Sequence, residues 1–82
     1  MVESFGARLA VRIKDRGPLC VGIDPSADQL RAWGRGDDIT GLEFFMLQML
    51  EASTGVAVAV KPQVAFFERF GSKGFAALER LI

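Results

Sequence analysis

The feature that most constrains the fold is a run at residues 56–61, Val-Ala-Val-Ala-Val-Lys, which Pro62 follows. Valine at alternate positions favours a β-strand, because β-branched side chains pack well on a pleated surface. The run is apolar on both faces, as in strands of parallel sheets that are covered on both sides. Lys61 stands where such a strand leaves the core, and in α/β folds ligands bind at that edge of the sheet. We therefore predict a buried strand that ends at a functional lysine.

A second strand is predicted at residues 19–24, a short apolar run that ends at Asp24 before Pro25. Gly22 inside this run indicates a close approach of the backbone or a small inward position. Helical patterns surround the strands: one after a Ser4 cap up to Gly17-Pro18, one at 27–33 after Ser26, one at 40–52, and one after a Ser72 cap. Strands that alternate with amphipathic helices pair in parallel through right-handed crossovers, so the fold class is α/β.

Composition excludes several classes of function. The chain has 82 residues, with ten basic and ten acidic side chains and no histidine. Balanced charge without a basic stripe argues against nucleic acid as a partner. No apolar run approaches the roughly 20 residues that span a bilayer, and no signal-peptide pattern opens the chain, so we expect a cytoplasmic protein that does not bind membranes. Without histidine, a Ser-His-Asp triad within the chain and most zinc sites are excluded, and we expect no bound metal.

Cys20 is the only cysteine, so no disulfide can form within the chain. It lies in an apolar run, and no histidine is present to activate a thiol. We therefore expect a small buried side chain rather than a nucleophile.

The two predicted strands end on charges of opposite sign, Asp24 and Lys61. Neighbouring strands lie about 4.8 Å apart, so both side chains would emerge close together at one edge of a parallel sheet. A carboxylate accepts hydrogen bonds from hydroxyls, and an ammonium donates them and carries charge, so the pair suits a polyol or a sugar phosphate. The structural alternative is an ion pair that closes the sheet, or a turn role for Asp24. We expect the other loop and helix acids to be solvated, namely Asp37, Asp38, Glu43, Glu51 and Glu79.

Two blocks of the sequence resemble one enzyme family. Leu-Cys-Val-Gly-Ile-Asp-Pro-Ser at 19–26 and Val-Lys-Pro-Gln-Val-Ala-Phe-Phe-Glu at 60–68 are similar to the first two strand ends of orotidine 5′-phosphate decarboxylase. The similarity is greater to the longer bacterial subfamily, and it continues through residues 71–81. It covers essentially the whole chain, and the second block is the more specific of the two.

This resemblance implies a TIM (β/α)8 barrel, typically of about 250 residues, of which residues 1–82 would be the N-terminal part of one domain: a helix and the first two βα units. It implies conversion of orotidine 5′-phosphate to UMP and CO2 in pyrimidine biosynthesis, by a homodimer without a metal or organic cofactor. Asp24 matches the aspartate that binds the ribose hydroxyls. Lys61 matches a catalytic lysine that contacts ribose and orients a neighbouring aspartate.

The family's third-strand motif, Asp-x-Lys-x-x-Asp, does not occur in the sequence, nor do its late phosphate-binding loops. The helical pattern of residues 75–82 has no stop signal, so we expect a fragment or a gene model truncated early, which by the resemblance would be a truncated barrel. We therefore expect this chain to be inactive alone. Two alternatives are a related sugar-phosphate decarboxylase or synthase of the same superfamily, where an acid is expected in place of Lys61, and a non-catalytic fragment.

Overall fold

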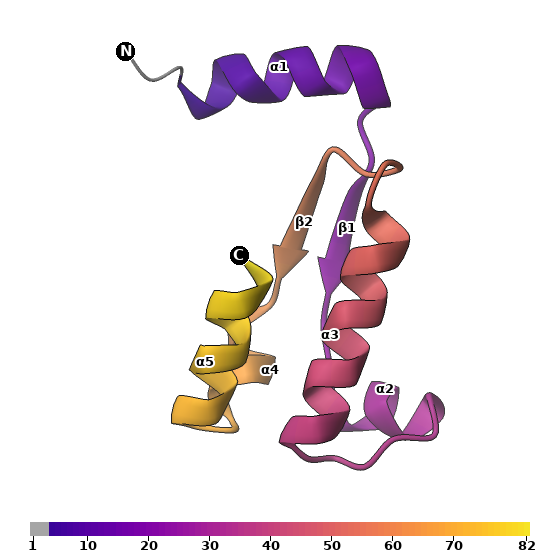
Figure 1. Cartoon of the computed structure of the whole chain (residues 1–82), viewed down its shortest axis with the longest axis vertical. Helices are drawn as coiled ribbons and strands as arrows, with labels where there is room; N and C mark the ends of the chain where they lie inside the picture. Colours follow the sequence, from indigo (N-terminus) through magenta and orange to yellow (C-terminus); the bar gives the residue numbers. More distant parts are fainter. Residues whose placement is uncertain (1–3) are drawn as a thin grey trace.

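The computed structural model describes residues 4–82, in which helices alternate with two strands (Figure 1). The elements are α1 (Phe5–Arg16), β1 (Cys20–Ile23), α2 (Ala27–Ala32), α3 (Ile39–Ser53), β2 (Ala59–Pro62), α4 (Val64–Glu68) and α5 (Ser72–Leu81). This order confirms the predicted α/β alternation and adds the short helix α4 after the second strand.

The two strands pair in parallel, as predicted, with Ile23 opposite Pro62. Backbone pairing continues past both ends of the strands. The Val58 N–H donates to the Leu19 carbonyl at 2.9 Å, and the Gln63 N–H donates to the Ile23 carbonyl at 3.0 Å. Helix α3 forms the crossover and runs back beside the sheet, so that both strands point the same way (Figure 1).

Strand β2 begins later than the valine pattern predicts. Residues 56–58 form a turn and a bend after α3, and Val56 is 57% exposed. The N–H groups of Val56 and Ala57 both donate to the Ser53 carbonyl, at 3.2 and 2.9 Å. These donors complete the end of α3 and are therefore not available to the sheet. The prediction of a strand from residue 56 is wrong for this reason.

The caps predicted at Ser4 and Ser26 are confirmed. Each hydroxyl accepts a hydrogen bond at 3.2 Å from the backbone N–H three residues later, which satisfies a donor left free at the helix start. The predicted cap at Ser72 is wrong, because Ser72 is the first residue of α5 and Gly71 holds the capping position. The φ of Gly71 is 64°, a value that glycine adopts without strain, and it lets the chain reverse between α4 and α5.

The core lies between the helices and one face of the sheet. The apolar stripe predicted for residues 40–52 is confirmed, because it supplies three of the buried side chains; the core consists of Ile23, Leu30, Leu42, Phe45, Met46, Phe67, Ala77 and Leu81. Helices α4 and α5 approach closely where a Cβ at Gly74 would overlap the Phe67 carbonyl oxygen. The absence of a side chain at residue 74 therefore permits this packing.

Helix α1 stands apart from this core. None of its residues is buried, and it lies across the end of the sheet where the strands begin (Figure 1). Cys20, which follows it, is exposed. The prediction of a buried Cys20 is wrong because the helices of the described segment pack on the other face of the sheet. None of the helices between residues 4 and 82 is long and apolar enough to cross a membrane.

Candidate functional site

Asp24 and Lys61 lie at the carboxyl ends of the strands, on the sheet face turned away from the core. The strand register places Lys61 opposite Gly22, and Asp24 comes two residues after Gly22. Side chains alternate between the faces of a strand, so these three positions share one face. The intervening residue, Ile23, is 0% exposed in the core, whereas Asp24 and Lys61 are exposed. The sheet therefore brings together the two site residues that the sequence predicts.

Gly22 provides the space that the Asp24 carboxylate occupies. A Cβ at this position would lie 3.3 Å from Oδ2 of Asp24. The carboxylate therefore folds back over the glycine, above the backbone position that pairs with Lys61. The group close to Gly22 is thus a side chain on an exposed face, and neither the close backbone approach nor the inward position predicted for this glycine is observed.

Asp24 and Lys61 do not form an ion pair. The ion pairs present in residues 4–82 join other side chains: Arg31 with Asp28, Arg69 with Asp37, and Arg80 with Glu43. The turn after β1 is made by the backbone, since the Ser26 N–H donates to the Asp24 carbonyl at 2.8 Å. The ion-pair alternative is therefore not observed in residues 4–82, whereas the backbone of Asp24 does take part in the turn after β1.

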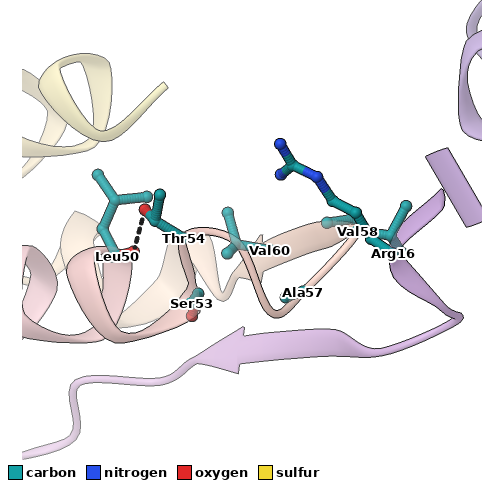
Figure 2. A pocket seen from close by; sticks show the side chains of 8 residues that line it. Arg16, Leu50, Ser53, Thr54, Ala57, Val58 and Val60 are labelled. Carbon is teal, nitrogen blue, oxygen red and sulfur yellow. Dashed lines mark hydrogen bonds between the residues drawn. The ribbon is translucent and has the colours of Figure 1, made fainter.

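Two cavities among the described residues lie at the opposite end of the sheet. One of about 190 Å³ is bounded by the end of α3, by residues 57–60 and by Arg16 (Figure 2). A second of similar volume separates α1 from Val58 and Ala59. Asp24 and Lys61 line neither of them, so the candidate site is an open corner. In barrels of parallel strands, the end where strands begin contributes to stability and the carboxyl end to function.

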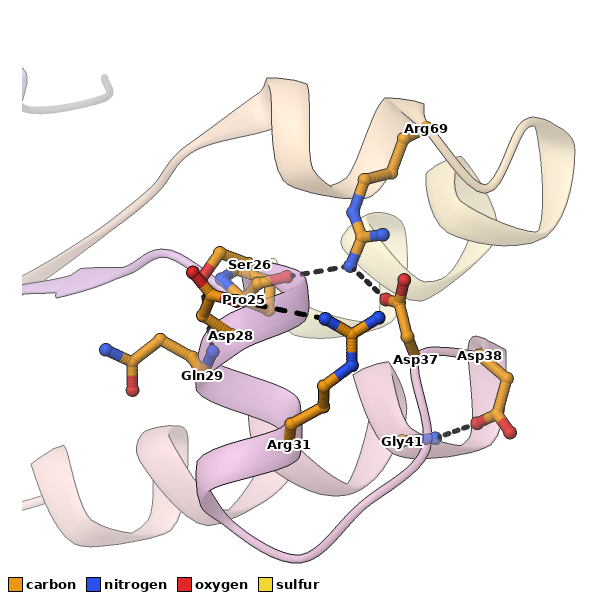
Figure 3. Close-up of polar contacts among 9 residues, drawn as sticks. All are labelled: Pro25, Ser26, Asp28, Gln29, Arg31, Asp37, Asp38, Gly41 and Arg69. Carbon is orange, nitrogen blue, oxygen red and sulfur yellow. Dashed lines mark hydrogen bonds and ion pairs between the residues drawn. The ribbon is translucent and has the colours of Figure 1, made fainter.

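Arg69, which follows α4, links the loops around this corner. Its Nη2 donates a hydrogen bond to the Pro25 carbonyl at 3.2 Å and lies 2.6 Å from Oδ1 of Asp37 (Figure 3). We call this three-residue contact the Arg69 bridge. Sequence patterns did not reveal it, because its members come from segments far apart in the chain. Arg69 occurs among phenylalanines, and no local pattern distinguishes it from a solvated arginine.

Three of the acids predicted to be solvated also make specific contacts, although Asp37 and Asp38 are exposed, as predicted, and Glu43 is half-buried. Asp37 belongs to the Arg69 bridge. Asp38 caps α3, where its Oδ1 accepts a hydrogen bond from the Gly41 N–H at 2.8 Å (Figure 3). Glu43 on α3 pairs with Arg80 on α5. Glu51 and Glu79 are exposed, as predicted.

The Arg69 bridge makes stability depend on pH. The hydrogen bond from Arg69 lowers the pKa of Asp37 below its ordinary value of 3.8, and the charges of Arg69 and Arg31 add to this effect against the opposing influence of burial. A carboxyl with a lowered folded-state pKa stabilises the fold above its unfolded pKa, and this contribution is lost as the pH falls through the folded pKa.

We expect Asp37→Asn to unfold at a lower urea concentration than the unsubstituted protein at pH 7. The difference between the two urea midpoints should shrink as the pH falls below about 3.8. Asp28→Asn is the matched control, because its side chain is 98% exposed and its contact with Arg31 is 3.8 Å long. A difference for Asp37→Asn that stays constant down to the lowest pH would contradict the prediction.

Comparison with known proteins identifies relatives of this chain. No family model matches the chain. Its relatives include orotidine 5′-phosphate decarboxylases from Nocardioides sp., 62% identical over 95% of the chain, and from Streptomyces coelicolor, 53% identical over 99% of the chain. The chain spans about 29% of the length of both relatives.

A solved structure from Streptomyces avermitilis, provisionally named an orotidine 5′-phosphate decarboxylase, has the same fold over this region. It superposes with a TM-score of 0.94 at 54% identity, over 99% of this chain and 28% of its own. The predicted fold class is thus confirmed: an N-terminal helix followed by two βα units of a TIM barrel. The chain is thus similar along almost its whole length to orotidine 5′-phosphate decarboxylases, and it corresponds to an N-terminal portion of their longer bacterial form.

Proposed function

We propose that this chain supplies the ribose-binding corner of an enzyme that converts orotidine 5′-phosphate to UMP and CO2. The observation that carries this assignment is the pair Asp24 and Lys61, exposed on one sheet face across Gly22 and not bonded to each other. The reaction is the one for which the relatives are named, the decarboxylation of orotidine 5′-phosphate.

Each residue has a role that follows from its chemistry. The Asp24 carboxylate has only acceptor oxygens and suits the ribose hydroxyls, which donate. The Lys61 ammonium donates to ribose and orients a further carboxylate of the active site. Loss of CO2 leaves an electron pair on the pyrimidine ring, and a fixed cation near that charge lowers the energy of the transition state. Lys61 is therefore the proposed catalytic residue of this segment.

The same proposal covers the larger assembly. Residues 1–82 form the first part of a single barrel domain that acts in pyrimidine biosynthesis, in the cytoplasm, as a homodimer. The sheet supports the assignment to a barrel, because the helices of the described segment leave the face with Asp24 and Lys61 uncovered. A closed barrel would turn that face toward its interior.

The test is a segment exchange. Residues 1–82 replace their counterpart in the Nocardioides relative, and decarboxylation of orotidine 5′-phosphate is followed by its change in absorbance. We call this protein the exchanged enzyme. It is expected to turn over substrate at a rate comparable with that of its parent, whereas the 82-residue chain alone shows none. A folded but inactive exchanged enzyme, or turnover by the chain alone, would show that the proposal is wrong.

A further inference from the structure

We infer that Arg69 is a positioning residue, which holds the loop after β1 so that Asp24 is presented to the ligand. The inference rests on the proposed function, because it assigns a support to one of its two site residues. The polar contacts of Arg69 in residues 4–82 are with the Asp37 carboxylate and with the backbone carbonyl of Pro25, the residue after Asp24.

One nitrogen atom makes both contacts of the Arg69 bridge. Nη2 lies 3.2 Å from the Pro25 carbonyl oxygen and 2.6 Å from Oδ1 of Asp37 (Figure 3). Pro25 follows β1, Asp37 lies in the loop before α3, and Arg69 follows α4. A single guanidinium thus ties the second βα unit to two loops of the first.

The contact with Pro25 constrains Asp24 because the backbone on each side of Asp24 is already restrained. The Pro25 side chain is fully buried, and its ring fixes φ. On the other side, the Ile23 carbonyl accepts the Gln63 N–H at 3.0 Å, at the end of the strand pairing. The peptide group after Asp24 is held as well, because the Asp24 carbonyl accepts the Ser26 N–H at 2.8 Å. Arg69 holds the next carbonyl, that of Pro25, and so fixes the peptide group that follows this turn.

Arg69 is itself held in place. Its guanidinium carbon lies 4.3 Å from the centroid of the Phe70 ring, and Phe70 packs against the core. A cation over an aromatic face is favourable, and more so when it is partly removed from water. The Arg69 side chain is 31% exposed and that of Asp37 29%. Since Asp37 balances its charge, Arg69 is occupied as a structural link rather than as a ligand for phosphate.

The inference predicts an effect on binding rather than on the chemical step. Lys61 is held by its register in β2, which the Arg69 bridge does not touch. In the exchanged enzyme, Arg69→Ala is expected to raise KM for orotidine 5′-phosphate about tenfold, less than the roughly 100-fold that a 1 Å misplacement can cost. The kcat should stay within about threefold of the parent value.

Two further variants separate positioning from general stability. Arg69→Lys is expected to recover part of the lost affinity, because a single ammonium replaces the single nitrogen that makes both contacts. Arg80→Ala is the matched control. It removes an ion pair between α5 and α3 that touches neither Pro25 nor Asp37, so KM should not change.

Amide hydrogen exchange provides a measurement that needs no turnover. Amides at residues 26–30 are expected to exchange faster in Arg69→Ala than in the parent, and at the parent rate in Arg80→Ala. Unchanged KM together with unchanged exchange in Arg69→Ala would overturn the inference and leave the proposed function intact. The opposite outcome is also distinguishable. If Arg69→Ala speeds hydrogen exchange at these amides but the exchanged enzyme has no decarboxylase activity, the loop is held by Arg69 and the proposed function is wrong.

Discussion

Replacement of Lys61 by alanine in the exchanged enzyme is expected to lower kcat by about 100- to 1,000-fold, the range seen when one preorganised electrostatic group is removed from an active site. The fold should not change, because Lys61 is exposed and the neighbouring Val60, which packs against the core, keeps its side chain. Steady-state kinetics give the loss of activity, and thermal unfolding followed by circular dichroism shows whether the structure is retained.

The matched control for this substitution is Lys73→Ala. Lys73 is an exposed lysine in the first turn of α5, away from the strand ends, so the control removes the same charge from the same chain. Its kcat should equal that of the parent enzyme. If Lys61→Ala also retained near-parent activity, the catalytic role proposed for Lys61 would have to be abandoned.

Replacement of Phe67 by alanine is expected to lower the free energy of unfolding by about 3–5 kcal/mol, the usual cost of removing a buried aromatic side chain. Phe67 is 0% exposed and is the buried residue of α4, a helix of five residues. Because a whole domain is typically stable by only about 5–15 kcal/mol, this one change removes a large part of the margin. Denaturant unfolding of the exchanged enzyme measures the loss.

Phe75→Ala serves as the comparison for Phe67. The Phe75 side chain, on α5, is 44% exposed, so its truncation removes less apolar surface from the interior. We expect a shift well below that of Phe67→Ala, about 1 kcal/mol or less. Equal losses for the two variants would mean that α4 does not pack in the core as described.

Local patterns were sufficient for much of the architecture. A serine before an apolar stripe predicts a helix start, and Ser4 and Ser26 cap helices as expected. The failures at Ser72 and at residues 56–58 have different causes. Gly71 takes the capping position because it has the φ that the turn needs. The strand starts after residue 58 because the N–H groups of Val56 and Ala57 bond to the end of α3.

The candidate site was predicted only in part, for a comparable reason. A charge at the end of an apolar strand is visible in the sequence, so Asp24 and Lys61 were found. The Arg69 bridge was not, because an arginine and an aspartate have no spacing rule when they lie in different units of the fold. Asp38 as a helix cap was within reach, since an acid before an apolar stripe is a known start signal.

The sequence by itself determined the element types, the parallel pairing and the two charged strand ends, because periodicity, caps and strand termini depend on residues close together in the chain. Only the tertiary structure decided which face carries Asp24 and Lys61, that Gly22 lies between them, and that Arg69 holds the loop beside them. These features depend on strand register and on contacts between residues far apart in the chain. Local sequence patterns do not specify either of them.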